Sequence, residues 1–144
     1  NCPPQQILKY RAKISGPLLD RIDIQLTVPA VEYEKLTEAR QGESSKNIRE
    51  RVVRARQIQE ARFQNSSTRN NSGMTRKELE LHAQLSDSSR KILEQAMTKM
   101  GLSARAYDRI LKVARTLADL AEQQNVETLH VAEAIQYRNL DRPI

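Results

Sequence analysis

The fold of this protein is decided by residues 101–121, which read GLSARAYDRILKVARTLADLA. Ser103 predicts a helix start, because a serine hydroxyl at that position accepts a hydrogen bond from a free backbone N–H of the first turn. Apolar residues then recur at helical spacing in an expected seam of Tyr107, Ile110, Ala114, Leu117 and Ala121, flanked by Leu111, Ala118 and Leu120. The stretch therefore predicts a long amphipathic helix with one buried face.

Two helices are predicted earlier in the chain. Asn47–Phe63 carries apolar residues at helical spacing. Thr75 and Glu78 form a capping-box pattern, in which a hydroxyl and a carboxylate each satisfy a free backbone N–H, and the helix that they begin should end near His82. The residues between these helices, at about 64–74, are polar and low in complexity, which predicts a flexible loop.

Two more helices are predicted on either side of the long one. Ser86 should cap a helix that Gly101 ends in the left-handed conformation that glycine adopts easily. Thr128 should cap a last helix. Residues 47–144 are therefore predicted to form a mainly α fold, a helical bundle with its own small core.

The beginning of the chain has a different pattern. A helix-like stretch at Gln5–Ile14 is stopped by Ser15-Gly16-Pro17. Apolar residues then alternate with polar ones over Ile22–Val28, which predicts a half-buried strand that Pro29 ends. One strand cannot satisfy its own hydrogen bonds, so the stretch is interpreted as the last strand of a sheet whose other strands precede it.

This pattern divides the chain into three parts. Residues 1–29 are interpreted as the end of a larger core, residues 30–46 as a polar connector and the remainder as the helical domain. The chain begins at Asn1 without a methionine, and we interpret it as a fragment of a longer protein. We expect residues 1–45 to be partly disordered, or paired with another copy, in such a fragment.

The composition limits the classes of function. The 144 residues contain 24 Lys and Arg against 18 Asp and Glu, and the net charge of +6 favours an acidic partner such as nucleic acid or a nucleotide. Solvated helix faces explain the same charge equally well. The single Cys2 excludes an internal disulfide. No apolar run reaches the roughly 18 residues that a membrane span needs. We therefore expect a cytoplasmic protein.

No hydrolytic or metal centre can be assembled from these residues alone. The sequence has no glycine-rich phosphate loop, no His-Glu-x-x-His and no paired cysteines. His82 and His130 lie near expected helix ends, which favours surface or capping roles. Asp20 and Asp23 lie at a strand entry, where carboxylates more often bind a neighbouring arginine or backbone. The basic helix at 47–63 contains glutamates and almost no aromatic residues, so it is interpreted as a solvated or intersubunit face.

Two motifs together carry a resemblance to a known family. Residues 14–23 read ISGPLLDRID, residues 101–116 read GLSARAYDRILKVART, and the ending HVAEAIQYR at residues 130–138 is similar as well. The chain resembles the C-terminal part of magnesium-chelatase-like AAA+ ATPases, and most closely their ComM (YifB) branch. The resemblance implies the last helix and strand of an α/β AAA+ core at 1–29, and a helical lid domain at 47–144.

The resemblance also implies roles for three arginines. Arg21 corresponds to an arginine finger that completes the ATP site of a neighbouring subunit in trans. Arg105 corresponds to a sensor-2 arginine, which contacts the γ-phosphate of ATP in its own subunit. Arg109 would share that phosphate site or pair with Asp108. From residue type alone, the alternative for Arg21 is an ion pair with a neighbouring aspartate.

ATP and Mg²⁺ are the ligands that the resemblance implies for the full-length parent. This fragment lacks the Walker A and Walker B elements of the family, so we expect no enzymatic activity and no tight nucleotide binding from it alone. Cys2 matches the last cysteine of a family stretch whose other cysteines would lie upstream, and we assign no metal to it.

The function that the resemblance implies is that of an oligomeric motor, expected to be a hexamer, that promotes DNA branch migration during natural transformation. A first alternative is the motor subunit of a true magnesium chelatase, whose motif tends toward Leu-Leu-Asp-Arg-Phe-Gly. A second alternative is a free-standing helical module that binds DNA or a partner protein.

Overall fold

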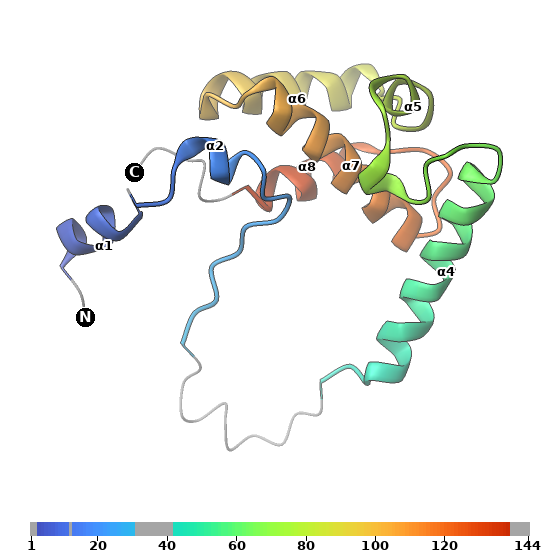
Figure 1. Ribbon diagram of the computed structural model, residues 1–144, viewed down its shortest axis with the longest axis horizontal. Coiled ribbons are helices and arrows are strands. Elements are labelled where there is room, and N and C mark those ends of the chain that lie inside the picture. Colours follow the sequence, from blue (N-terminus) through green and yellow to red (C-terminus); the bar gives the residue numbers. More distant parts are fainter. Residues whose placement is uncertain (1–2, 12, 31–41, 139–144) are drawn as a thin grey trace.

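The computed structural model describes residues 3–11, 13–30 and 42–138, and the regular elements of these residues are helical. In chain order they are α1 (Pro4–Arg11), α2 (Gly16–Leu19), α4 (Ser45–Phe63), the 3-10 helix η1 (Asn71–Gly73), α5 (Arg76–His82), α6 (Asp87–Met100), α7 (Ala104–Leu120) and α8 (Thr128–Gln136). Helices α5 to α8 lie together, whereas α4 extends away from them (Figure 1). The predicted mainly α fold is confirmed. None of the described helices is both long enough and apolar enough to cross a membrane.

Side-chain caps begin three helices at the predicted residues. Thr75, Ser86 and Ser103 each accept a hydrogen bond from a backbone N–H of the first turn, at 3.3, 3.2 and 3.2 Å. The Glu78 carboxylate accepts from the Thr75 backbone N–H at 2.8 Å, which completes the capping box. Gly101 ends α6 with a φ of 62°, a conformation that a side chain disfavours.

The start of α8 differs from the prediction. Thr128 is the first helical residue and Glu127 is the cap residue. The reason is His130, whose Nδ1 accepts a hydrogen bond from the Glu127 backbone N–H at 3.0 Å and so moves the cap back by one residue. The Thr128 hydroxyl lies 3.0 Å from the Ser89 hydroxyl, and this hydrogen bond joins the starts of α6 and α8.

The hydrophobic core is centred on α7. Ile110 and Ala114 of the predicted seam are buried, whereas Ala121 is exposed because α7 ends at Leu120. The seam packs with apolar side chains from α5, α6 and α8, among them Leu79, Leu93, Val131 and Ala134. The same helix also buries two charged residues that the predicted seam did not include, Arg115 and Asp119.

Asp119 is the centre of a buried polar network that joins α4, η1 and α7. Its carboxylate accepts N–H hydrogen bonds from Arg62 at 2.7 Å, from Asn71 at 2.8 Å and from Arg115 at 3.1 Å. Arg115 also donates to two carbonyl oxygens of the turn after α7, at 2.6 and 2.8 Å. Buried charges are tolerated when they are paired and hydrogen-bonded, so this network specifies how α4 lies against α7.

The polar stretch at about 64–74, which was expected to be flexible, is anchored in its second half. Asn71 is buried, its backbone N–H donates to Gln59 Oε1 at 3.2 Å, and its side-chain amide donates to the Thr116 hydroxyl at 3.0 Å. Met74 is buried in the core. An asparagine side chain carries both donors and an acceptor, so one polar residue of this stretch satisfies several buried partners.

The predicted strand at Ile22–Val28 is wrong for the part of the chain that the structure describes. The apolar side chains of this stretch are exposed, Val28 by 85%, and Gln25 is the buried residue. Gln25 forms one isolated bridge to Arg138, and its backbone N–H donates to the Tyr137 carbonyl oxygen at 2.6 Å. Because no described strand lies beside this stretch, its alternating side chains have no sheet face to cover.

Two helix boundaries also differ from the predictions. Helix α1 ends at Arg11, before the predicted Ile14. Helix α4 begins at Ser45 rather than Asn47, because the Ser44 hydroxyl accepts a hydrogen bond from the Asn47 backbone N–H at 3.3 Å. Most of the predicted connector, residues 31–41, lies outside the described residues.

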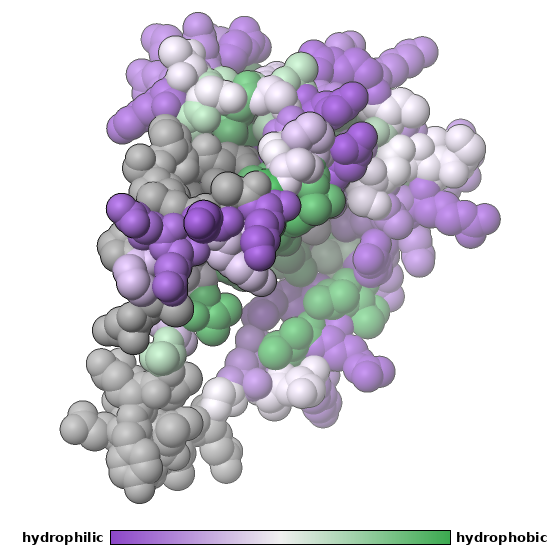
Figure 2. Space-filling view, turned by 60° about the vertical axis from the view of Figure 1, so that its left-hand side comes forward, coloured by the Kyte–Doolittle hydropathy of each residue, from purple (hydrophilic) through white to green (hydrophobic). Residues whose placement is uncertain are grey.

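Apolar side chains also lie open on the surface, where Figure 2 shows hydrophobic groups among hydrophilic ones. In the first half of α4 they are Ile48, Val52 and Val53. The buried residues of α4 lie in its second half and are Ala55, Gln59 and Phe63. The helix is therefore packed against the core only by its C-terminal half.

Replacing Asp119 by alanine should lower the free energy of unfolding by about 3 kcal/mol or more, because two guanidinium groups would lose the carboxylate that they share. Urea unfolding followed by far-UV circular dichroism measures the change. The matched control is Glu94→Ala on the exposed face of α6, which should cost no more than about 0.5 kcal/mol. Equal costs for the two variants would contradict the role given to Asp119.

Glu78 should make the stability of the protein depend on acid pH. The Thr75 backbone N–H first, and the Ser66 hydroxyl second, lower the pKa of Glu78 from 4.5 to about 2. A pKa lowered by folding stabilises the protein above pH 4.5, and this contribution is lost as the pH falls from 4.5 toward 2. The melting temperature of Glu78→Gln should therefore lie below that of the wild type at pH 7 and approach it near pH 2.

Ser66→Ala is the matched control for this titration, because it removes one of the hydrogen bonds to Glu78 and keeps the carboxylate. Its melting temperature should fall less than that of Glu78→Gln at pH 7, and the gap to the wild type should close over the same pH range. A gap between wild type and Glu78→Gln that stays constant from pH 7 to pH 2 would refute the lowered pKa.

Candidate functional site

Arg105 lies in the first turn of α7, at a position set by Gly101 and by the Ser103 cap. Its side chain is exposed and forms no hydrogen bond or ion pair with any residue that the structure describes. The free N–H groups make the start of a helix electropositive, so a cation there is unfavourable unless an anion is close. The helix start and the guanidinium together favour the binding of an anion such as phosphate.

Arg21 follows the short helix α2 and is also exposed. Its Nη1 donates to the Pro17 carbonyl oxygen at 2.9 Å, which leaves most of the five N–H donors of the guanidinium open to solvent. The alternative in which Arg21 pairs with Asp20 or Asp23 is not observed, because both carboxylates lie against other arginines.

Arg109 has a partner that the sequence did not suggest. It forms a close ion pair with Asp23, a residue 86 positions away in the chain. The predicted pair with Asp108 is wrong, because Asp108 pairs with Arg76 of α5 at 2.7 Å. The Asp23–Arg109 pair places the segment after α2 against the second turn of α7. That Arg109 also shares a phosphate site stays a prediction.

Arg138, two residues after the end of α8, contacts the same segment. The residue is fully buried, its Nη1 donates to the Ile22 carbonyl oxygen at 2.9 Å and its Nη2 to the Leu19 carbonyl oxygen at 3.4 Å. Its Nη2 also lies 3.9 Å from the Asp20 carboxylate. These contacts lie on both sides of Arg21. The sequence carried no signal for this role, because arginine is rarely fully buried.

The two histidines have structural roles, His130 at the start of α8 and His82 against the ring of Phe63. His130 is buried and accepts the hydrogen bond that caps α8, which confirms the capping role but not a surface position. The ring of His82 packs edge-on against Phe63, with ring centroids 5.6 Å apart. Burial, and then the charge of Arg62, lower the pKa of His82. The described residues contain no group of three or more His, Cys, Asp or Glu that could hold a metal, and Cys2 lies outside them.

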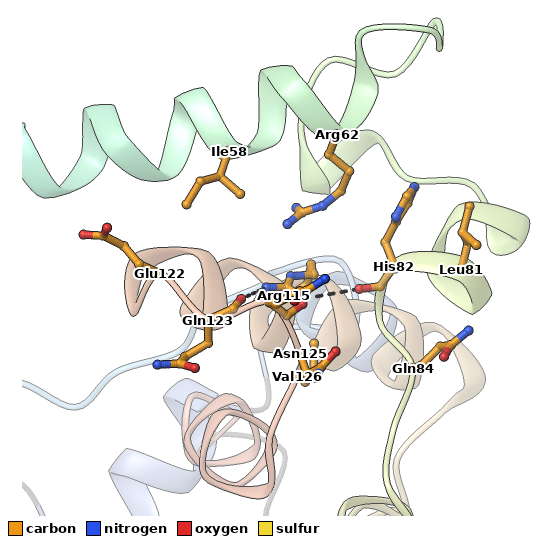
Figure 3. Close-up of a pocket in the computed structure, with 11 residues that line it drawn as sticks. Ile58, Arg62, Leu81, His82, Gln84, Arg115, Glu122, Gln123, Asn125 and Val126 are labelled. Atoms are coloured by element: carbon orange, nitrogen blue, oxygen red, sulfur yellow. Dashed lines mark hydrogen bonds between the residues drawn. The ribbon is translucent and has the colours of Figure 1, made fainter.

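A polar cleft of about 520 Å³ lies between α4, α5 and the turn after α7 (Figure 3). Arg115 lines it, and its guanidinium already donates four hydrogen bonds, to Asp119, to the His82 carbonyl oxygen and to two carbonyl oxygens of the turn. The cleft is therefore the open side of the buried network, and the guanidinium of Arg115 serves that network.

Comparison with known proteins agrees with the motifs. The family model for the C-terminal part of magnesium chelatase subunit ChlI matches residues 42–138, and the model for magnesium chelatase subunit ChlI matches residues 1–36. The chain is 42% identical over 140 residues to the competence protein ComM of Haemophilus influenzae, covering 96% of the chain and 27% of that protein. It is 36% and 37% identical over 142 residues to the YifB proteins of Salmonella typhimurium and Escherichia coli, covering 98% of the chain and 27% of each protein.

Each family model covers one of the two arginine motifs. ISGPLLDRID, with Arg21, lies within residues 1–36, and GLSARAYDRI, with Arg105, lies within residues 42–138. The relatives confirm the resemblance to the ComM (YifB) branch. The chain spans 27% of the length of these relatives. It belongs to the magnesium chelatase ChlI family, of which residues 42–138 match the C-terminal part.

Proposed function

We propose that this chain is the C-terminal part of a ComM-type AAA+ ATPase. Arg105 would act on the ATP of its own subunit, and Arg21 on the ATP of a neighbouring subunit. One observation carries the proposal: both guanidinium groups are exposed and without a carboxylate partner among the described residues, whereas the nearby aspartates contact Arg109 and Arg138. A guanidinium keeps its charge throughout the physiological pH range and binds phosphate oxygens through paired N–H donors. Two such groups in one chain suit a shared nucleotide site.

Arg105 would act in cis, within its own subunit. Bound Mg²⁺–ATP supplies the phosphoryl group that is transferred to water. Arg105 would bind and orient phosphate oxygens, because its guanidinium and the free N–H groups of the first turn of α7 both attract negative charge. Because Arg105 is part of α7, and α7 lies at the centre of the helical core, hydrolysis or release of the nucleotide would shift the position of that core.

Arg21 would act in trans, at the ATP site of the neighbouring subunit. Its N–H donors face solvent on the segment after α2, so they are available to a second chain. A positive charge added from outside stabilises the charge that spreads over the phosphoryl oxygens during transfer. Hydrolysis would then depend on assembly, which fits a homo-oligomer, for which we propose a hexamer.

The cellular role that we propose is that of a cytoplasmic DNA helicase, which promotes branch migration when incoming DNA is integrated during natural transformation. The name of the relative from Haemophilus influenzae, a competence protein, supports this role. The chain carries no phosphate loop, so we expect only weak nucleotide binding by this chain alone. DNA would act through other parts of the full-length protein.

A motor subunit of a true magnesium chelatase is the alternative within the family, and the names of the two family models favour it. The motif of this chain ends in Ile22-Asp23, whereas chelatase motors tend toward Phe-Gly. A glycine at residue 23 could not form the ion pair with Arg109. A free-standing helical binding module is the alternative from another class, and the absence of nucleotide hydrolysis by the full-length protein would favour it.

In the full-length protein, Arg21→Ala and Arg105→Ala should each lower DNA-stimulated ATP hydrolysis on the order of 10³-fold, because each removes a charge that stabilises phosphoryl transfer. Steady-state ATPase assays with single-stranded and forked DNA measure the loss. The control is Arg90→Ala on α6, which should keep wild-type activity. Arg90 is exposed, and its ion-pair partner Asp87 lies 3.9 Å away. Stimulation by a porphyrin-chelatase partner instead of DNA would favour the chelatase alternative.

Mixed assemblies separate the two arginine roles. A Walker-defective subunit still supplies Arg21, so mixing it with Arg21→Ala subunits should restore hydrolysis. The same mixture with Arg105→Ala subunits should stay inactive, because no site would combine an intact phosphate loop with its own Arg105. Rescue of both variants, or of neither, would contradict the assignment of one arginine in trans and the other in cis.

A further inference from the structure

The segment 19–25, which contains Arg21, is held by α7 and by Arg138, which follows α8. Arg138, two residues beyond the end of α8, contacts it through the Ile22 carbonyl oxygen, and the second turn of α7 contacts it through the ion pair between Asp23 and Arg109. Among the residues that the structure describes, its regular backbone hydrogen bonds are those of the turn that ends α2 and of the isolated bridge at Gln25. These side-chain contacts therefore determine where the segment lies.

The contact with Arg138 is the more restrictive of the two, because this guanidinium is buried. A fully buried guanidinium must have its N–H donors satisfied, and here the carbonyl oxygens of Leu19 and Ile22 accept from it. The backbone N–H of Gln25 donates to the carbonyl oxygen of the residue before Arg138, at 2.6 Å. The contacts bracket Arg21, so its backbone is fixed although its side chain is open to solvent.

The ion pair of Asp23 connects the segment to α7, the helix that carries Arg105. Arg109 lies on α7 one helical turn after Arg105, so both project from the same rigid element. Both members of the Asp23–Arg109 pair are partly exposed, with 49% and 32% of the side chains accessible. Substitution of either residue should therefore leave the core intact.

We propose that Arg138 and the Asp23–Arg109 pair are positioning residues, which hold Arg21 in a fixed relation to α7 so that Arg105 and Arg21 move as one body. The catalytic consequence rests on the proposed function. A shift of α7 caused by nucleotide at Arg105 would then move Arg21 toward or away from the neighbouring subunit's ATP. The nucleotide bound to one subunit would thereby change the rate of hydrolysis in the neighbouring subunit.

Charge reversal in the full-length protein tests the pair. Asp23→Arg and Arg109→Asp should each lower kcat at least about tenfold while the KM for ATP stays within about twofold, because Arg21 is misplaced in trans and the subunit's own site is intact. The double variant restores an ion pair of opposite polarity and should regain kcat to within about threefold of the wild type. The matched control is Asp108→Arg, which breaks the pair with Arg76 and should leave kcat within about twofold.

A second readout separates positioning from a general loss of structure. Mixing Asp23→Arg subunits with Walker-defective subunits should restore hydrolysis, as expected for Arg21→Ala, because the defect lies in what the subunit offers to its neighbour. A damaged helical domain would also lose its own site and would not be restored. Absence of restoration, or no recovery in the double variant, would overturn the proposal. A rise in KM for Arg109→Asp alone would show instead that Arg109 contacts nucleotide.

Hydrogen exchange in the full-length protein tests the contacts without any activity. The backbone amide of Gln25 should exchange at least about tenfold faster in Arg138→Ala than in the wild type, and Asp23→Arg should give a smaller increase that the double variant reverses. Unchanged exchange in all variants would overturn the inference while the proposed function stands. Altered exchange together with an ATPase that needs Arg21 but ignores Asp23→Arg would overturn the positioning role alone. A wild type without ATPase activity would overturn the proposed function, and the coupling with it.

Discussion

The carboxylate of Asp119 is the contact on which the helical domain depends. Apart from this contact, α4 reaches the core with few apolar side chains, chiefly Ala55 and Phe63. Such a small apolar contact does not specify one orientation of a helix. The hydrogen bonds from Arg62 of α4 and from Asn71 of η1 to the buried Asp119 carboxylate are directional, and they orient α4 against α7. The orientation of α4 is therefore set by charged and polar contacts, whereas the apolar core packs around α7.

Arg138 applies the same chemistry at the other end of the domain. Like Arg115, it is buried and donates to carbonyl oxygens of irregular backbone, in one case the turn after α7 and in the other the segment after α2. Irregular backbone has no helix or sheet partner for its carbonyl groups, and a guanidinium offers up to five donors to replace them. Part of the basic composition of this chain therefore serves its own architecture, and the net charge of +6 overstates what is available to an acidic partner.

The sequence predicted those features that depend on neighbouring residues. Ser86, Ser103 and the pair Thr75 and Glu78 begin their helices as expected, because a cap acts within one turn. The prediction of a strand at 22–28 followed from a correct reading of the alternation, but a strand needs neighbours, and these are not visible in a local pattern. The exposed positions of Arg21 and Arg105 agree with the motifs that singled them out.

The contacts between residues far apart in the chain could not be predicted in this way. Asp23 meets Arg109 across 86 residues, and Arg138 meets Leu19 across 119. Nothing in the residue types distinguishes these arginines from those on a solvated face, because the difference lies only in the backbone that the fold brings to them. Asn71 is a similar case, since a polar stretch looks like a loop whether or not one of its side chains enters the core.

The one-sided attachment of α4 has a consequence for its length. Its last turns are held by Gln59, Phe63 and the Asp119 network, whereas its first turns rely on the Ser44 cap and on the paired hydrogen bonds from Arg51 to Glu43. A helical stretch of so few turns is only marginally stable in water without tertiary contacts. A partner packed against the exposed Ile48 and Val52 would therefore stabilise the first turns of α4 without any change in the packing of the core.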